Sequence, residues 1–169
     1  MFDVLAKIFK TGCLTGKVPP PDQTVIEFGT VCRKEIVRIF GKSLAIRMVD
    51  AGSCNGCELE IHALNNGFYD IERFGIHFVA SPRHADLLLV TGPVARHMQA
   101  ALKRTYEATP DPKLVIAMGD CGADGGEFGV SYASCGAVAN VIPVDAVIRG
   151  CPPSPLQLLQ GITELLRRR

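Results

Sequence analysis

The sequence predicts an α/β fold: an open parallel sheet with helices on both faces, preceded by an N-terminal arm. Short apolar stretches typical of strands alternate with longer stretches typical of helices. Two of the predicted strands are apolar along their length, as strands covered on both faces must be. The chain has 169 residues, of which 47% are hydrophobic, and this suits one domain with a sizeable core.

The elements of the sheet domain follow one another in a regular order along the chain. The strands are predicted at 44–49, 76–80, 86–91, 114–118 and 147–149. The helices between and after them are predicted at 58–65, 94–108 and 155–168. Gly67 and Pro110 lie where the first two helices should stop. Pro155 suits the start of the last helix, and the three arginines at its end oppose the helix dipole.

Residues 1–40 differ from the rest, and we treat them as an N-terminal docking arm before an α/β domain at 41–169. Apolar positions within 1–10 are compatible with a short amphipathic helix. Three consecutive prolines at 19–21 then favour an extended segment. A second short helix is predicted at 33–40, ended by Gly41. The apolar content of this arm favours docking on another surface over a free terminus.

Composition argues against several classes of protein. The formal net charge is +1, tryptophan is absent and aromatic residues make up 7%, so nucleic-acid binding is not expected. The longest charge-free run, 128–144, is broken by glycine and proline and is unsuited to a transmembrane helix. The N-terminus does not have the pattern of a secretory signal. We therefore expect a cytoplasmic protein that is soluble by itself.

Seven cysteines in an apparently cytosolic chain point to metal binding or catalysis and away from disulfides. Cys54 and Cys57 follow the first strand, Cys121 follows the strand ending at Met118, and Cys151 follows the last strand. The carboxyl ends of parallel strands share one edge of the sheet, where ligands bind. Four thiols from three loops are therefore predicted to converge there.

The neighbours of these cysteines suit a bulky anionic group. Glycines such as Gly56 and Gly122 adjoin them and let backbone N–H groups come close. Cys57 is predicted at a helix N-terminus, where the dipole favours negative charge. Pro152 follows Cys151, as proline often follows cysteine in iron–sulfur proteins.

Four thiolates suit either Zn²⁺ or a [4Fe–4S] cluster. One local pair plus two separate cysteines, on a core large enough to fold without zinc, favours the cluster over zinc and over ordinary buried thiols. Cys13, Cys32 and Cys135 are interpreted as small buried hydrophobic residues. Cys135 is also a rival to Cys121 as the third ligand.

Six motifs follow one another along the chain: Gly52–Glu60, Ser81–Asp86, Val90–Pro93, Gly119–Gly126, Ile142–Asp145 and Gly150–Pro153. Together they resemble a known family, the 20-kDa subunit of respiratory Complex I together with the small subunits of membrane-bound, energy-converting [NiFe] hydrogenases. The resemblance covers roughly residues 44–168. Complex I members typically carry two adjacent cysteines at the first position, whereas this chain has Cys54-x-x-Cys57. The separated pair is similar to the hydrogenase branch, including the small subunit of formate hydrogenlyase.

The resemblance implies a flavodoxin-like fold and one [4Fe–4S] cluster on Cys54, Cys57, Cys121 and Cys151. It implies that this cluster is the terminal electron relay in a multi-subunit oxidoreductase, with the chain not catalytic alone. The implied partners are a ferredoxin-like iron–sulfur subunit, membrane subunits, and a large subunit with a Ni–Fe or quinone site. The implied location is the inner face of the cell membrane, reached through those partners.

A few further residues have both a structural and a functional interpretation. Glu58 suits the acidic start of a helix, or tuning of the cluster and proton passage toward a neighbouring subunit; Glu60 is interpreted as structural. Arg83 and His84 suit a solvated loop with an Arg83–Asp86 pair, or contact with the large subunit near the cluster. We favour the contact, because the resemblance includes this motif.

Three alternatives remain open at this point. Within the same class, the chain suits a Complex-I-type quinone reductase or a relative whose large subunit has lost its Ni–Fe ligands. A zinc-stabilised binding module is the alternative from another class. A flavodoxin-like nucleotide binder is disfavoured, because Cys54-Asn-Gly-Cys57 supplies thiols where phosphate-binding loops supply Ser, Thr or Lys.

Overall fold

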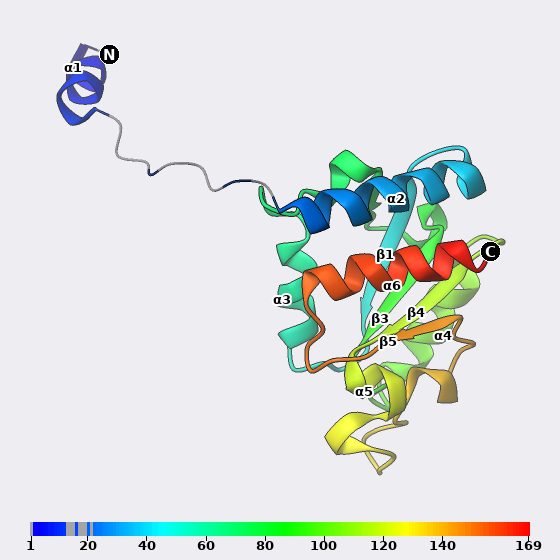
Figure 1. The fold of residues 1–169 in the computed structure, drawn as a ribbon. Helices are drawn as coiled ribbons and strands as arrows, with labels where there is room; N and C mark the ends of the chain where they lie inside the picture. Colours follow the sequence, from blue (N-terminus) through cyan, green and yellow to red (C-terminus); the bar gives the residue numbers. More distant parts are fainter. Residues whose placement is uncertain (1, 13–15, 17–19, 21) are drawn as a thin grey trace.

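The computed structural model describes residues 2–12, 16, 20 and 22–169. Five parallel strands form one sheet in the order β2-β1-β3-β4-β5 (Figure 1). This is the doubly wound order of flavodoxin-like proteins, so the predicted fold class is confirmed. The strands are β1 (Leu44–Asp50), β2 (Ile76–Phe78), β3 (Leu87–Thr91), β4 (Leu114–Met118) and β5 (Ala146–Ile148).

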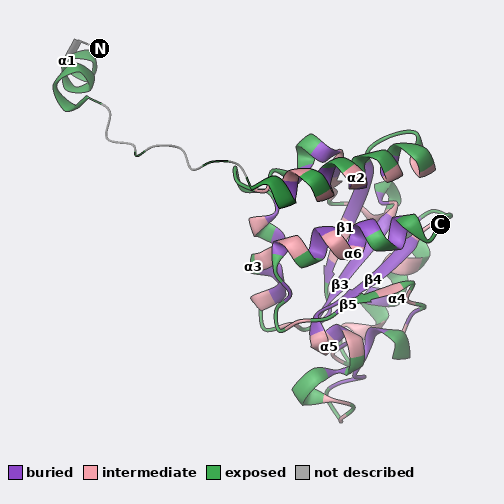
Figure 2. Ribbon diagram, viewed as in Figure 1, coloured by how far each residue is buried: buried purple, intermediate pink, exposed green. Residues whose placement is uncertain are grey.

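Helices cover both faces of the sheet. On one face, α2 (Gln23–Phe40), α3 (Gly56–Ala63) and α6 (Pro155–Arg167) bury apolar side chains against alternate strand residues. On the other face, α4 (Gln99–Ala108) contributes Leu102 to a second apolar cluster. Every residue of β3 and β4 is buried between these layers, as their continuous apolar sequences require (Figure 2).

The last helix begins where the sequence predicts. Ser154 caps α6 by accepting a hydrogen bond from the Gln157 backbone N–H, and the Gln157 side chain accepts one from the Ser154 N–H. Pro155 occupies the first turn, where a missing N–H costs nothing. These features fix the start of α6 just after the loop that carries Cys151.

Helix α2 is longer than predicted, because it begins at Gln23 and not near residue 33. Asp22 caps it by accepting a hydrogen bond from the Thr24 backbone N–H. It packs beside α6 and buries Cys32 and Ile36 in the main core. This part of the predicted arm therefore lies against the sheet domain itself, and a domain boundary at residue 40 stays a prediction.

Helix α4 is shorter than predicted, because it begins at Gln99 and not at Val94. The Val94 N–H donates to the Gly136 carbonyl at 2.9 Å, and the Ala95 N–H donates to the Ala51 carbonyl at 2.8 Å. These backbone groups tie the segment to neighbouring loops and so cannot form the hydrogen bonds of a helix.

No helix within the described ranges is long and apolar enough to cross a bilayer.

Candidate metal centre

The four predicted cysteines line one cavity of about 80 Å³ at the carboxyl edge of the sheet. Cys54 lies in the loop after β1, and Cys57 is the second residue of α3. Cys121 lies within the short helix α5 (Gly119–Asp124), and not in a loop as predicted. Cys151 lies in the loop between β5 and α6. The fold therefore brings together thiols from segments nearly a hundred residues apart.

The loop that carries Cys54 is held by its own hydrogen bonds. The Asp50 carboxylate accepts from the N–H groups of Gly52 and Ser53, each at 2.8 Å. The Ser53 hydroxyl oxygen accepts from the Asn55 N–H at 3.0 Å. Asn55 adopts a left-handed conformation, with φ of 72°, immediately before α3 begins. This closed turn places Cys54 and Cys57 beside the cavity.

Glu58 is a buried carboxylate behind this loop. Its two oxygens accept hydrogen bonds from the hydroxyls of Ser53 and Thr91. Thr91 is the last residue of β3 and is fully buried. Glu58 thereby connects the cysteine loop to the end of the neighbouring strand, which supports a role beyond that of a charged helix start.

A pair of reciprocal hydrogen bonds, the Asp120–Gly150 clasp, joins α5, which carries Cys121, to the loop that carries Cys151. The Asp120 N–H donates to the Gly150 carbonyl at 3.0 Å, and the Gly150 N–H donates to the Asp120 carboxylate at 3.1 Å. Beside it, the Arg149 guanidinium donates to the Asp124 carboxylate at 2.9 Å. That bond, together with one from the Gly126 N–H, lowers the pKa of Asp124.

Glycines leave room around the sulfur atoms. A Cβ atom at Gly119 would lie 2.8 Å from the Cys57 Sγ, and one at Gly126 would lie 2.9 Å from the Cys121 Sγ. Both glycines have positive φ, which L side chains rarely adopt. The bare backbone beside two of the thiols is a cradle that side chains would fill, and it suits a bulky inorganic group.

The electrostatics of the cavity oppose four free thiolates. Burial, the Glu58 carboxylate and the other three cysteines raise the pKa of Cys57 from 9.0 to about 12. Burial raises the pKa of Cys121 too, with further contributions from Cys151, Cys54 and the adjacent aspartates. Negative charge on neighbouring sulfur atoms therefore disfavours ionisation of Cys57 and Cys121, and bound cations would remove that penalty.

The four thiols line the cavity from separate segments of the chain. Among the described side chains, no group of three or more His, Cys, Asp or Glu residues is placed to hold a metal ion.

The remaining predicted residues divide into two sets. Gly56 and Pro152 line the cavity, while Gly122 does not, and a Cβ atom there would make ordinary contacts of 3.6 Å with the backbone of Ala117 and Val90. Arg83 and His84 do not line the cavity, so their expected position near the cluster is not found, whereas their contact with a large subunit stays a prediction. They form a 3₁₀ turn before β3 and so lie near its amino-terminal end, away from the cavity.

The predicted pair between Arg83 and Asp86 is also replaced by another. The Asp86 carboxylate binds the Lys42 ammonium group at 2.9 Å and accepts from the Ala45 N–H at 3.1 Å. Asp86 thus fixes the start of β3 against the start of β1. The turn at 82–84 directly precedes this junction, at the end of the sheet away from the thiols.

The three other cysteines have separate positions. Cys32 is buried in the main core beneath α2, and burial raises its pKa to about 11. Cys135 is buried in the second apolar cluster and does not line the cavity, so it does not compete with Cys121. Cys13 lies outside the described residues.

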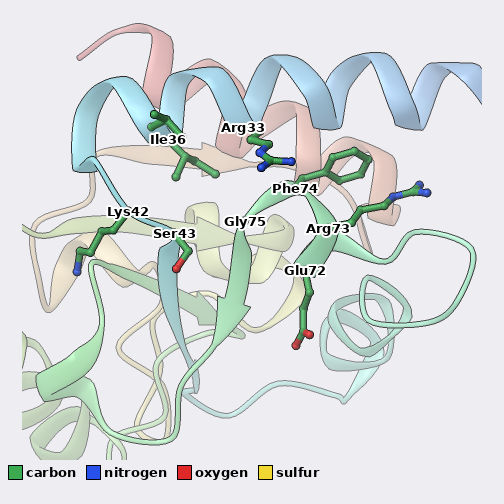
Figure 3. A pocket seen from close by; sticks show the side chains of 9 residues that line it. Arg33, Ile36, Lys42, Ser43, Glu72, Arg73, Phe74 and Gly75 are labelled. Carbon is green, nitrogen blue, oxygen red and sulfur yellow. The ribbon is translucent and has the colours of Figure 1, made fainter.

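A larger hollow of about 280 Å³ lies between α2 and the 3₁₀ turn at Ile71–Phe74 (Figure 3). It is lined by basic and apolar side chains together with Ser43 and Glu72, and no cysteine lines it. Two of its basic residues are already engaged, since Lys42 binds Asp86 and the Arg73 guanidinium lies 4.6 Å from the Phe74 ring centroid. The thiol cavity is therefore the better candidate for metal chemistry despite its smaller volume.

Sequence reasoning missed the residues that support the cysteines. Ser53, Thr91, Asp120 and Arg149 all act through hydrogen bonds to loops or to Glu58. Three of these residues could have been found from the sequence, because Ser53, Asp120 and Arg149 each lie within two residues of a predicted cysteine ligand. For Thr91, a hydroxyl in an otherwise apolar strand was the signal.

Comparison with known proteins identifies relatives of the whole α/β domain. The family model described as NADH ubiquinone oxidoreductase, 20 kDa subunit, matches residues 54–165. A probable membrane-bound hydrogenase subunit of Pyrococcus furiosus is 45% identical over 134 residues, which cover 79% of this chain and 80% of that protein. Formate hydrogenlyase subunit 7 of Escherichia coli is 42% identical over 147 residues, covering 87% of this chain. The match spans 58% of that longer relative.

A solved structure has the same fold. It is a chain of the membrane-bound sulfane sulfur reductase, an archaeal respiratory membrane complex. The two chains superpose with a TM-score of 0.67 and are 38% identical, over 80% of this chain and 74% of the other. The relatives thus include subunits of a hydrogenase and of a formate hydrogenlyase, and also a subunit of a sulfane sulfur reductase.

Proposed function

The chain belongs to the family of the 20-kDa subunit of NADH ubiquinone oxidoreductase, and we propose that it is an electron-transfer subunit carrying one [4Fe–4S] cluster. Its relatives are small subunits of membrane-bound hydrogenase or Complex-I-like oxidoreductases, and the chain is such a subunit without catalysis of its own. Cys54, Cys57, Cys121 and Cys151 are the proposed ligands. The main support for this proposal is that these four thiols line one cavity, which glycine residues also line.

The chain's own residues have defined tasks in this proposal. The four thiolates bind iron, and the cluster when bound supplies a one-electron carrier. Glu58 holds the Cys54 loop against β3 by accepting two hydroxyl hydrogen bonds. The Asp120–Gly150 clasp holds α5, with Cys121, against the loop with Cys151. Two-electron chemistry then belongs to a partner subunit that holds the substrate.

The thiol cavity is open on the side that a partner would cover. Cys54 and Cys151 are exposed in the chain by itself, whereas Cys57 is buried and Cys121 is half-buried. A large subunit over this edge would exclude water from the cluster. A ferredoxin-like subunit would deliver electrons, and the assembly would lie on the inner face of the cell membrane through its membrane subunits.

We assign the large subunit to the [NiFe] hydrogenase type. Two relatives that are 42% and 45% identical are named as subunits of a formate hydrogenlyase and of a probable membrane-bound hydrogenase. The Cys54-x-x-Cys57 spacing also favours this branch. The second candidate is a large subunit without nickel, favoured by the 38% identity to a chain of a sulfane sulfur reductase.

Anaerobic purification of the native assembly, with metal analysis and EPR after reduction, tests the proposal. We expect about four irons for this chain beyond those of the other subunits, lost in Cys121→Ser and retained in Cys135→Ser. Nickel in the assembly selects the hydrogenase, and an iron-loaded assembly without nickel selects the second candidate. Zinc without iron at this chain overturns the electron-transfer role.

A further inference from the structure

We infer that α1 (Phe2–Thr11) lies on an anionic membrane surface, with its apolar face among the lipid chains and its lysines toward the headgroups. This gives the chain a membrane contact of its own, in addition to contacts through partner subunits. The inference rests on the proposed function only in requiring that a membrane lies close to the assembled protein.

The apolar side chains of α1 are uncovered. Every residue from Asp3 to Thr11 is exposed (Figure 2), and Phe9 is 85% exposed. Large exposed apolar side chains so close together mark a surface that binds something. A helix of ten residues is also too short to be stable alone in water, since isolated helices below about 12–15 residues are marginal. Contact with another surface would stabilise it.

The residues of α1 are sorted onto two sides. At 100° per residue, Val4, Leu5, Ile8 and Phe9 share one side of the helix. The four polar residues share the other side; these are Asp3, Lys7, Lys10 and Thr11. These four apolar residues span about 140° of the circumference, which is wider than the narrow seam by which a helix packs on one partner helix.

Charge favours a lipid surface as the occupant. The two lysines outnumber the single aspartate, and both lie on the polar side. An apolar face with Phe and Leu opposite lysines is the pattern of helices that lie in the membrane interface. At 1.5 Å per residue, α1 spans roughly 15 Å, half of the ~30 Å hydrocarbon core, so it would lie on the bilayer and not cross it. Anionic headgroups would attract Lys7 and Lys10.

Flotation of the full chain with lipid vesicles tests this inference. The vesicles contain phosphatidylcholine with phosphatidylglycerol, or phosphatidylcholine alone. The double variant Ile8→Glu with Phe9→Glu should bind both at least about tenfold more weakly. The double variant Lys7→Gln with Lys10→Gln should lose about fivefold per lysine on anionic vesicles only. Val37→Glu is the matched control, because Val37 is an exposed apolar residue of α2.

The outcomes separate this inference from the proposed function. Wild-type chain that stays unbound to anionic vesicles overturns the inference, as does equal binding of the Ile8→Glu, Phe9→Glu variant. Binding that requires the membrane subunits also overturns it, because α1 would then dock on protein. Cys54→Ser should lose iron and keep vesicle binding. A wild-type chain that binds vesicles but contains no iron would contradict the proposed cluster and leave the membrane inference standing.

Discussion

Two glycines with the same positive φ provide a sharp test of the thiol cavity. Gly119 and Gly75 both have a φ of 82°. A Cβ atom at Gly75 would meet nothing within 4 Å, whereas one at Gly119 would lie 2.8 Å from the Cys57 Sγ. The variants Gly119→Ala and Gly75→Ala thus both place a side chain at positive φ, and they differ in whether they displace a proposed ligand.

The size of each effect follows from these contacts. A left-handed conformation costs a non-glycine residue about 1–2 kcal/mol, so both variants should lose about that much stability as iron-free protein. In Gly119→Ala the Cys57 sulfur must also move from 2.8 Å out to the 3.4 Å of an ordinary contact, a shift of about 0.6 Å. Metal–ligand distances tolerate only about 0.2 Å, so iron binding should suffer in this variant alone.

The assay combines thermal unfolding of the iron-free chains with iron analysis and EPR of the anaerobic proteins. For a chain of this length, the strain should lower Tm by about 2–8 °C in both variants. Gly75→Ala should keep the iron content of the wild type, and Gly119→Ala should lose most of it. Equal iron content and equal EPR spectra in the two variants would refute the assignment of the cavity.

Three further predictions concern the supporting residues. Glu58→Gln should raise the reduction potential of the bound cluster, since it removes a negative charge beside Cys57; EPR-monitored redox titration measures this. Asp120→Ala should speed iron removal by a chelator roughly fivefold, because the Gly150 N–H loses its acceptor, worth about 1 kcal/mol at a partly exposed site. Iron-free protein should lose about 2 kcal/mol less stability between pH 9 and pH 11 when it carries Cys32→Ala, as measured by denaturant unfolding.

The direction of the alkaline effect comes from the thiol. Burial raises the pKa of Cys32 from 9.0 to about 11, so between these values the folded chain holds a proton that the unfolded chain has released. Stability from this group is present below pH 9 and is lost as the pH rises toward 11. An unchanged pH slope in Cys32→Ala would contradict this origin.

Matched controls separate local from general effects in Glu58→Gln and Asp120→Ala. Glu60→Gln removes a carboxylate from the same helix as Glu58, and a potential shift as large as that of Glu58→Gln would contradict the special position of Glu58. Asp111→Ala removes a largely exposed carboxylate away from the cavity. Iron release as fast in this variant as in Asp120→Ala would show that the clasp is unimportant.

Continuous apolar runs made most of the sheet predictable. The strand at 114–118 is found with the predicted bounds, because its five apolar residues are buried on both faces and flanked by polar or glycine residues. The start of α4 was not predictable from periodicity. The backbone groups of Val94 and Ala95 bond to Gly136 and Ala51, and these partners are distant in sequence.

The gathering of the cysteines was predictable from one rule, and its supports were not. Each cysteine follows a strand, so the shared carboxyl edge of a parallel sheet brings the four together. Arg83 and His84 precede β3, and the same rule, applied to them, would have assigned them to the opposite edge. The clasp between Asp120 and Gly150 joins residues thirty positions apart, a pairing that only the order of β4 and β5 reveals.

Mössbauer spectroscopy of the chain, expressed with ⁵⁷Fe and purified anaerobically, tests the central claim most directly. Our account predicts about four irons per chain with the spectrum of a [4Fe–4S] cluster, retained in Cys135→Ser and lost or converted in Cys151→Ser. A chain that binds zinc in place of iron, or that keeps the same cluster spectrum in Cys151→Ser, would contradict the assignment of the four-cysteine cavity.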